Sequence, residues 1–96
     1  MNFRSSIVTR VDLSADRTIQ AGDSITVFGI IFANSSGFDA EIDVSDGNGT
    51  KKITMTVRSH DSRFIDIPFV ADNGLRIDSI GSDQVYVTVF HSQGGS

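Results

Sequence analysis

The sequence predicts an all-β protein, an antiparallel β-sandwich or jelly-roll-like barrel of about seven strands. Short runs rich in β-branched and aromatic residues recur, turn residues separate them, and no segment has the 3.6-residue period of an amphipathic helix. The 96 residues suffice for one domain with a core and are too few for two. We therefore expect a single domain over 1–96, with 1–6 as an N-terminal arm and 92–96 as a mobile tail.

The first strand is expected to end at Leu13. Ile7, Val11 and Leu13 fall on one side of the extended chain and charged residues on the other, which is the alternation of a half-buried strand. Residues 14–23 are polar around a single large apolar side chain. We expect a connection that this side chain, Ile19, fixes to the core.

Residues 24–34, reading SITVFGIIFAN, form the expected central strand. β-branched and aromatic residues dominate this run, which is too short and too poor in helix formers for a buried helix. Both of its faces are apolar: Ile25, Val27, Ile31 and Ala33 on one, and Phe28, Ile30 and Phe32 on the other. One face can pack on the domain's own core, so the other must be covered by a loop, by the N-terminal arm or by another subunit.

The run AEIDVSDGNGTKKITMTV, residues 40–57, predicts a β-hairpin. Asn48-Gly49 suits a two-residue type I′ turn, because both central positions of that turn need a positive φ. The resulting register places Asp46 opposite Lys51, Val44 opposite Ile53, Ile42 opposite Met55 and Ala40 opposite Val57. Apolar residues then meet apolar partners, and an acid meets a base.

Three further strands are expected after a polar connection at 58–63. Residues 64–70 form the first of them, and Pro68 within it predicts an edge position because proline donates no ladder hydrogen bond. Residues 75–80 form a short strand between two turns. The last strand, VYVTVF at 85–90, is apolar on both faces like the central strand.

Composition argues against several classes of function. The chain has no cysteine, which removes disulfides and thiolate metal sites. Twelve acids and eight bases give a net charge of −4, and the bases are scattered, whereas nucleic-acid binding uses a clustered basic patch. No apolar run approaches the roughly 20 residues of a membrane-spanning helix. We expect no cofactor, and neither nucleic acid nor a membrane as partner.

The chemistry-bearing side chains do not form a catalytic pattern. Ser59-His60-Asp61 contains the residue types of a hydrolase triad, but sequence neighbours on an extended loop cannot converge on one point. We expect a solvated loop there and no catalytic residues. A zinc site at His60 and His91, the only histidines, would need carboxylates to complete it. Both histidines are expected at the surface, and no metal site is predicted.

Two binding alternatives stay open. Asp39, Glu41, Asp43 and Asp46 beside a glycine-rich turn suggest calcium, but alternation spaces the first three about 6.5 to 7 Å apart along one strand face, whereas a calcium loop wraps around one point. A solvated outer face is the expected role of these acids. Carbohydrate binding is the other alternative. It usually requires exposed Trp or Tyr, and this chain has no Trp and a single Tyr, Tyr86.

Four segments carry a resemblance to a known family: ITVFGIIFAN, SDGNGTKKITMTV, DIPFVADNGL and VYVTVFHS, which lie between residues 24 and 92. Together they resemble small virion structural proteins of tailed bacteriophages, particularly T7-like podoviruses that infect marine cyanobacteria. No specific motif is recognised in residues 1–23. These motifs belong to strands and turns and carry no catalytic group.

The resemblance implies a non-enzymatic role in the virion, assembled in the host cytoplasm. A capsid decoration or cement protein that binds the shell of the major capsid protein is the first expectation. A tail component, or a head-fibre or knob component, is the alternative. Since the doubly apolar strands call for cover, we expect a homo-oligomer, with a trimer as the first guess. We assign the interface to Phe28, Ile30, Phe32, Tyr86 and Phe90.

Overall fold

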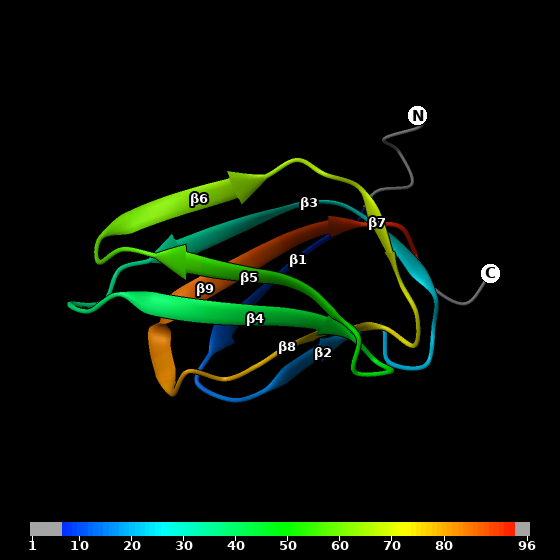
Figure 1. Cartoon of the computed structure of the whole chain (residues 1–96), viewed down its shortest axis with the longest axis horizontal. Coiled ribbons are helices and arrows are strands. Elements are labelled where there is room, and N and C mark those ends of the chain that lie inside the picture. Colours follow the sequence, from blue (N-terminus) through cyan, green and yellow to red (C-terminus); the bar gives the residue numbers. More distant parts are fainter. Residues whose placement is uncertain (1–6, 94–96) are drawn as a thin grey trace.

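A computed structural model of the chain describes residues 7–93, and within them it contains nine β-strands and no helix. The strands are β1 (Ile7–Leu13), β2 (Arg17–Ile19), β3 (Ile25–Asn34), β4 (Ala40–Asp46), β5 (Lys51–Val57), β6 (Asp61–Ile65), β7 (Phe69–Ala71), β8 (Leu75–Ile77) and β9 (Ser82–His91). They form two antiparallel sheets that pack face to face (Figure 1). The predicted all-β antiparallel sandwich is confirmed.

The order of the strands is that of a jelly roll. The five-stranded sheet runs β1-β9-β3-β6, with β7 also paired to β3, and the four-stranded sheet runs β2-β8-β4-β5. β6 and β7 follow the same edge of β3 and act as one interrupted strand. The chain then pairs like one long folded hairpin: β1 with β9, β2 with β8, β3 with β6 and β7, and β4 with β5. This nested pairing across two sheets defines the jelly roll.

The core lies between the sheets and draws alternate residues from both. The last strand, β9, supplies Val85, Val87 and Val89, each 0% exposed. Ile19 is 5% exposed, so the connection at 14–23 is fixed to the core as predicted, although its strand β2 was not predicted. The other buried apolar residues are Leu13, Ile25, Val27, Ile30, Phe32, Ala40, Ile42, Val44, Val57, Ala71, Leu75 and Ile77.

A β-bulge in β3 decides which of its residues face the core. Val27 pairs with His91 of β9, and Gly29 pairs with Phe90, the preceding residue of β9. Phe28 and Gly29 therefore share one outward position opposite a single residue of the neighbouring strand. After the bulge the alternation of β3 is shifted by one residue.

This shift corrects the two faces that were expected for β3. Ile30 and Phe32 point into the core and are 0% exposed, while Ile31 and Ala33 point outward and are half-buried. The assignment of Ile30 and Phe32 to an interface is therefore wrong, because both side chains are enclosed by their own subunit. A strict two-residue alternation has no place for the extra residue of a bulge.

The β4–β5 hairpin has the predicted register along its apolar residues. Val44 pairs with Ile53, Ile42 with Met55 and Ala40 with Val57. Towards the turn, however, Ser45 pairs with Lys51, so Lys52 is an extra residue and Asp46 does not face Lys51. The predicted ion pair is replaced by two others, Lys51 with Asp43 at 3.6 Å and Lys52 with Asp46 at 3.8 Å.

The turn itself is also different from the predicted type I′ turn. Gly49 has a positive φ of 86°, but Asn48 does not. The Asp46 carboxylate is 2% exposed and accepts hydrogen bonds from the backbone N–H groups of Asn48 and Thr50. This turn docks on the β7–β8 turn, because Gly47 N–H donates to the carbonyls of Asp72 and Gly74, both at 2.9 Å. Contact between two distant turns thus sets the loop geometry.

The strand predicted at 64–70 is divided in two. β6 starts earlier, at Asp61 inside the expected connection, and ends at Ile65, and β7 starts at Phe69. Pro68 lies in the gap between them, where no ladder hydrogen bond is needed. Both strands lie at one edge of the five-stranded sheet, as Pro68 predicted.

At the C-terminal end, Ser92 is held to the sheet. Its N–H donates to the Thr26 carbonyl at 2.8 Å, and its hydroxyl accepts from Thr26 N–H at 2.9 Å. The predicted mobile tail therefore cannot include Ser92. The rest of that prediction from 94 onward, and the arm predicted at 1–6, lie outside the described residues. Over 7–93 there is no helix of the length and hydropathy needed to cross a membrane.

Candidate functional site

Two surface features could carry a function. One is the outer face of the five-stranded sheet, which is apolar over much of its area. The other is a hollowed end of the sandwich, where the β3–β4 loop meets the β5–β6 turn.

The apolar face is defined by the outward residues Val8, Phe28, Ile31, Phe64, Tyr86 and Phe90. Strand register brings them together, because Val8 pairs with Phe90 across β1 and β9, and Ile31 pairs with Phe64 across β3 and β6. Val8 is 59% exposed and Phe64 is 60% exposed, and the other four are half-buried. Large apolar side chains at such exposure on one sheet face are typical of a docking surface.

Gly29 gives the apolar face its shape. A Cβ at this position would lie 3.2 Å from a ring carbon of Phe64 and 3.2 Å from the Ile65 carbonyl oxygen. The Phe64 ring therefore lies over Gly29, and Gly29 pairs with Phe90 of β9. The absence of a side chain at Gly29 lets aromatic residues of two separate strands share one patch.

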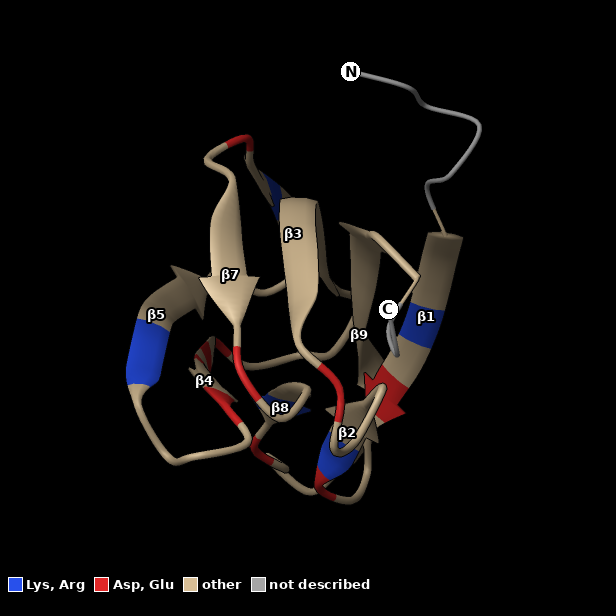
Figure 2. Cartoon of the chain, turned by 90° about the vertical axis from the view of Figure 1, so that its right-hand side faces the viewer, with Lys and Arg blue, Asp and Glu red and all other residues tan. Residues whose placement is uncertain are grey.

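The opposite surface of the sandwich is charged. The outward positions of the four-stranded sheet hold Glu41 and Asp43 on β4, the hydroxyl groups of β5, and Arg76 on β8. The Thr54 hydroxyl donates to Asp43 and, together with nearby Lys51, lowers the pKa of that carboxyl group. By contrast, β3 and β7 carry no charge at all (Figure 2). On the apolar face the charged residues are Arg10 and Asp12, at the edge strand β1.

The structure places three of the five predicted interface residues on the apolar face: Phe28, Tyr86 and Phe90. Their role as contacts remains a prediction. Sequence reasoning missed Val8 and Phe64, the most exposed members of the face. Phe64 begins the strand predicted at 64–70, but the alternate positions on its side of that strand are Asp66 and Pro68, so no run of apolar residues marked it as part of an apolar face.

Tyr86 does not present an open aromatic platform. The Arg10 guanidinium lies over its ring, 4.3 Å from the ring centroid. A sugar that stacked on this ring would have to displace the cation. The carbohydrate alternative therefore gains no support from Tyr86.

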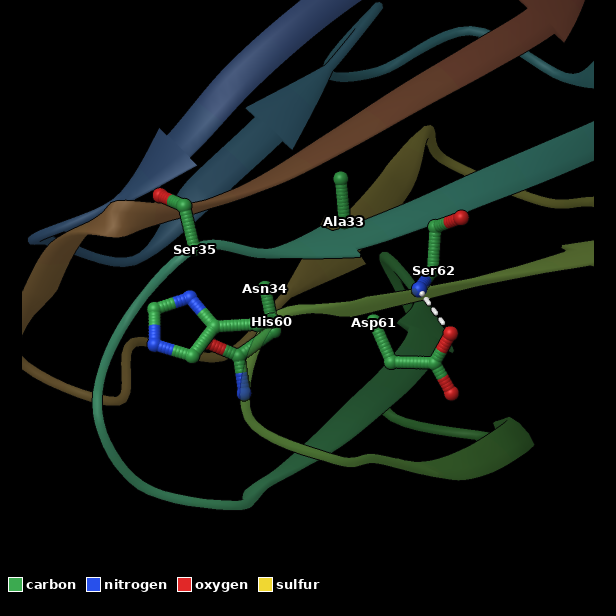
Figure 3. A pocket seen from close by; sticks show the side chains of 6 residues that line it. All are labelled: Ala33, Asn34, Ser35, His60, Asp61 and Ser62. Carbon is green, nitrogen blue, oxygen red and sulfur yellow. Dashed lines mark hydrogen bonds between the residues drawn. The ribbon is translucent and has the colours of Figure 1, made fainter.

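The hollowed end is polar, and its side chains are turned away from one another (Figure 3). Asp61 accepts a hydrogen bond from Ser62 N–H at 2.8 Å, and the Ser35 hydroxyl donates to the Gln84 carbonyl at 2.7 Å. His60 has a φ of 58°, which turns its exposed ring outward at the tip of the β5–β6 turn. Within residues 7–93 it makes no hydrogen bond to Ser35 or Asp61.

In the Ser59-His60-Asp61 segment, Ser59 makes hydrogen bonds to residues of the β3–β4 loop. The Ser59 hydroxyl donates to the Ser36 carbonyl at 2.7 Å, and Ser59 N–H donates to the Asp39 carboxylate at 3.0 Å. Next to it, an open depression is lined by Thr56, Arg58, Asp61 and Arg63. The two hydrogen bonds of Ser59 hold the turn in place.

The second histidine was predicted at the surface, and this prediction is wrong for His91. Its side chain is 0% exposed. Nδ1 lies 2.7 Å from the Ser92 carbonyl oxygen and donates to it, and Nε2 makes a hydrogen bond with the Thr9 hydroxyl at 2.8 Å. His91 is therefore a satisfied core residue that joins β1 to β9. Among the described residues, no three His, Asp or Glu side chains are grouped to hold a metal ion.

Comparison of the chain with protein-family models, with curated proteins and with solved structures found no match.

Proposed function

We propose that this chain is a non-enzymatic bacteriophage structural protein that decorates the capsid, and that it docks on the shell through the apolar face. The observation that supports docking is the contrast between the two outer sheet surfaces: Val8 and Phe64 are more than half exposed on one, and charged residues cover the other. The resemblance of the strand and turn segments to phage virion proteins supports the choice of partner. Jelly rolls occur in viral capsids as well as in lectins and cupins, so the fold is compatible with this role without deciding it.

The physical reason for docking is the removal of apolar surface from water. Each Å² of apolar area buried contributes about 25 cal/mol, against an entropy cost of association of at least about 4 kcal/mol. A shell offers many identical sites, and an oligomer engages several at once, which multiplies a modest contact. A homo-oligomer therefore suits this function, and a trimer fits three-fold positions of a capsid.

A binding assay tests the proposal. Purified protein is sedimented with shells assembled from the major capsid protein of a T7-like cyanophage, and we expect saturable binding at a fixed ratio. Phe64→Ser should reduce binding at least tenfold. Ile67→Ser is the control: it also replaces a large apolar side chain, 69% exposed in the β6–β7 link, and it should bind normally. No binding by the unmodified protein would contradict decoration. Antibody labelling at the tail in electron micrographs would favour the tail alternative instead.

A further inference from the structure

Three of the four edges of the two sheets carry features that block pairing with another strand. β2 has three residues, and β5 starts with two lysines. The β6–β7 edge is interrupted around Pro68, and β6 holds Asp61 and Arg63 at inward-facing positions. The remaining edge is β1, which has seven residues, no proline and no inward-facing charge. It is the edge best suited to accept a further strand.

The ladder identifies which backbone groups of β1 are free. Ser35 N–H donates to the Gln84 carbonyl, so even-numbered residues of β9 bond to β3 and odd-numbered ones bond to β1. In β1 the odd-numbered residues consequently bond to β9. Val8, Arg10 and Asp12 turn their N–H and C=O groups to the open edge. The Arg17 Nε donates to the Asp12 carbonyl at 3.0 Å, which agrees with this direction.

We propose that β1 pairs with β1 of a second copy of this chain, antiparallel about a two-fold axis at Val11. This register places Arg10 opposite Asp12 of the second copy, and Asp12 opposite its Arg10. The two pairs of opposite charge stabilise the contact on the outer side of the sheet. A register centred on Arg10 would instead bring two arginines face to face.

The Asp12 carboxylate has one oxygen available to accept a hydrogen bond from a second cation. Its Oδ1 accepts from the Ser14 hydroxyl at 2.6 Å and from Arg17 at 2.9 Å, whereas its Oδ2 makes no bond within residues 7–93. Arg10 projects from the same face at the same edge, above Tyr86. On pairing, the Asp12 carbonyl exchanges the Arg17 side chain for the Arg10 N–H of the second copy.

Pairing along β1 joins the two five-stranded sheets into one continuous sheet. Their apolar faces then lie side by side on the same surface, which doubles the area that one assembly presents to a partner. The pairing is independent of what the apolar face binds. It predicts a two-fold dimer as the basic unit, in place of the trimer.

Analytical ultracentrifugation over a concentration series up to about 1 mM tests the pairing. We expect a reversible dimer for the unmodified chain, and dimerisation at least about tenfold weaker for Arg10→Glu and for Asp12→Arg taken singly. An equal mixture of the two variants should dimerise again, because each cross-strand pair then joins opposite charges. Arg58→Glu and Asp66→Arg, which change the net charge equally away from β1, should behave like the unmodified chain.

A proline variant covers the case in which a charge variant fails to fold. Arg10→Pro removes an N–H that points to the open edge and leaves every hydrogen bond between β1 and β9 in place. Circular dichroism should therefore show a folded protein, and ultracentrifugation should show a monomer. An unmodified chain that is monomeric at every concentration would overturn the proposal. So would a mixture no more dimeric than its components, or a dimer that survives Arg10→Pro. Capsid binding is measured separately, so a failure of dimerisation can be distinguished from a failure of docking on the shell.

Discussion

Replacing Gly47 by alanine should strongly destabilise the fold, although this residue lies in an exposed turn. A Cβ at Gly47 would lie 2.0 Å from the Asn73 carbonyl oxygen and 2.6 Å from the carbonyl carbon. Backbone atoms cannot yield as a side chain can, so the β4–β5 and β7–β8 turns must separate by more than about 1 Å. Both hydrogen bonds donated by Gly47 N–H, to Asp72 and Gly74, would then break.

The expected loss follows from those contacts. Two hydrogen bonds contribute about 0.5 to 1.5 kcal/mol each, and the distorted packing beneath them adds to this, so we expect about 2 to 3 kcal/mol. For a domain of this size such a change lowers Tm by roughly 10 to 20 °C. Urea denaturation gives the free energy of unfolding, and a thermal scan by circular dichroism gives Tm.

Two matched glycine substitutions serve as controls. Gly37→Ala should change stability by less than about 0.5 kcal/mol, because a Cβ there meets no atom within 4 Å and the backbone is not left-handed. Gly49→Ala also meets no atom but has a φ of 86°, so it should lose about 1 to 2 kcal/mol from backbone strain alone. If Gly47→Ala were as stable as Gly37→Ala, the docking of the β4–β5 turn on the β7–β8 turn would contribute little to the stability of the fold.

Three further predictions concern the core and pH. Asn34 is 2% exposed, and its amide nitrogen donates to the backbone carbonyls of Phe38 and Val57. In Asn34→Asp a carboxylate without donors would face those two oxygens, so urea titrations should show an unfolding free energy lower by about 3 kcal/mol. Hydrogen bonds from the hydroxyl and then the backbone N–H of Ser14, with a further one from an arginine, lower the pKa of Asp12 from 3.8 to about 2. The contribution of these hydrogen bonds to folding stability is therefore fully present above about pH 4 and is lost as pH falls towards 2. Ser14→Ala should raise the pKa of Asp12, which a carboxyl NMR titration measures. Phe32→Ala should lower the free energy of unfolding by about 3 to 5 kcal/mol because the Phe32 side chain is 0% exposed. Phe90→Ala, on the half-buried outer face, should lower it by less than half as much. Equal losses would contradict the assignment of these residues to opposite faces.

The sequence alone determined the class of fold and the pairing of its most local element. Alternation in residues 40–57 fixed the apolar partners of the hairpin, although not the pairing next to its turn, because those residues are close in the chain and one face of each strand must be buried. Pro68 likewise indicated an edge, since proline lacks the amide that a central strand needs. For the candidate site, the double apolar character of β3 and β9 pointed to an outer face that needs cover.

Only the tertiary structure decided which residues form that face. The bulge at Phe28 and Gly29 arises where β3 meets β9, more than fifty residues away in the chain, and it sends Ile30 and Phe32 inward. Phe64 became part of this face because β6 pairs along the free edge of β3 and places Phe64 opposite Ile31. Partners distant in sequence leave no periodic signal within a short window, and their contacts settled what alternation left open.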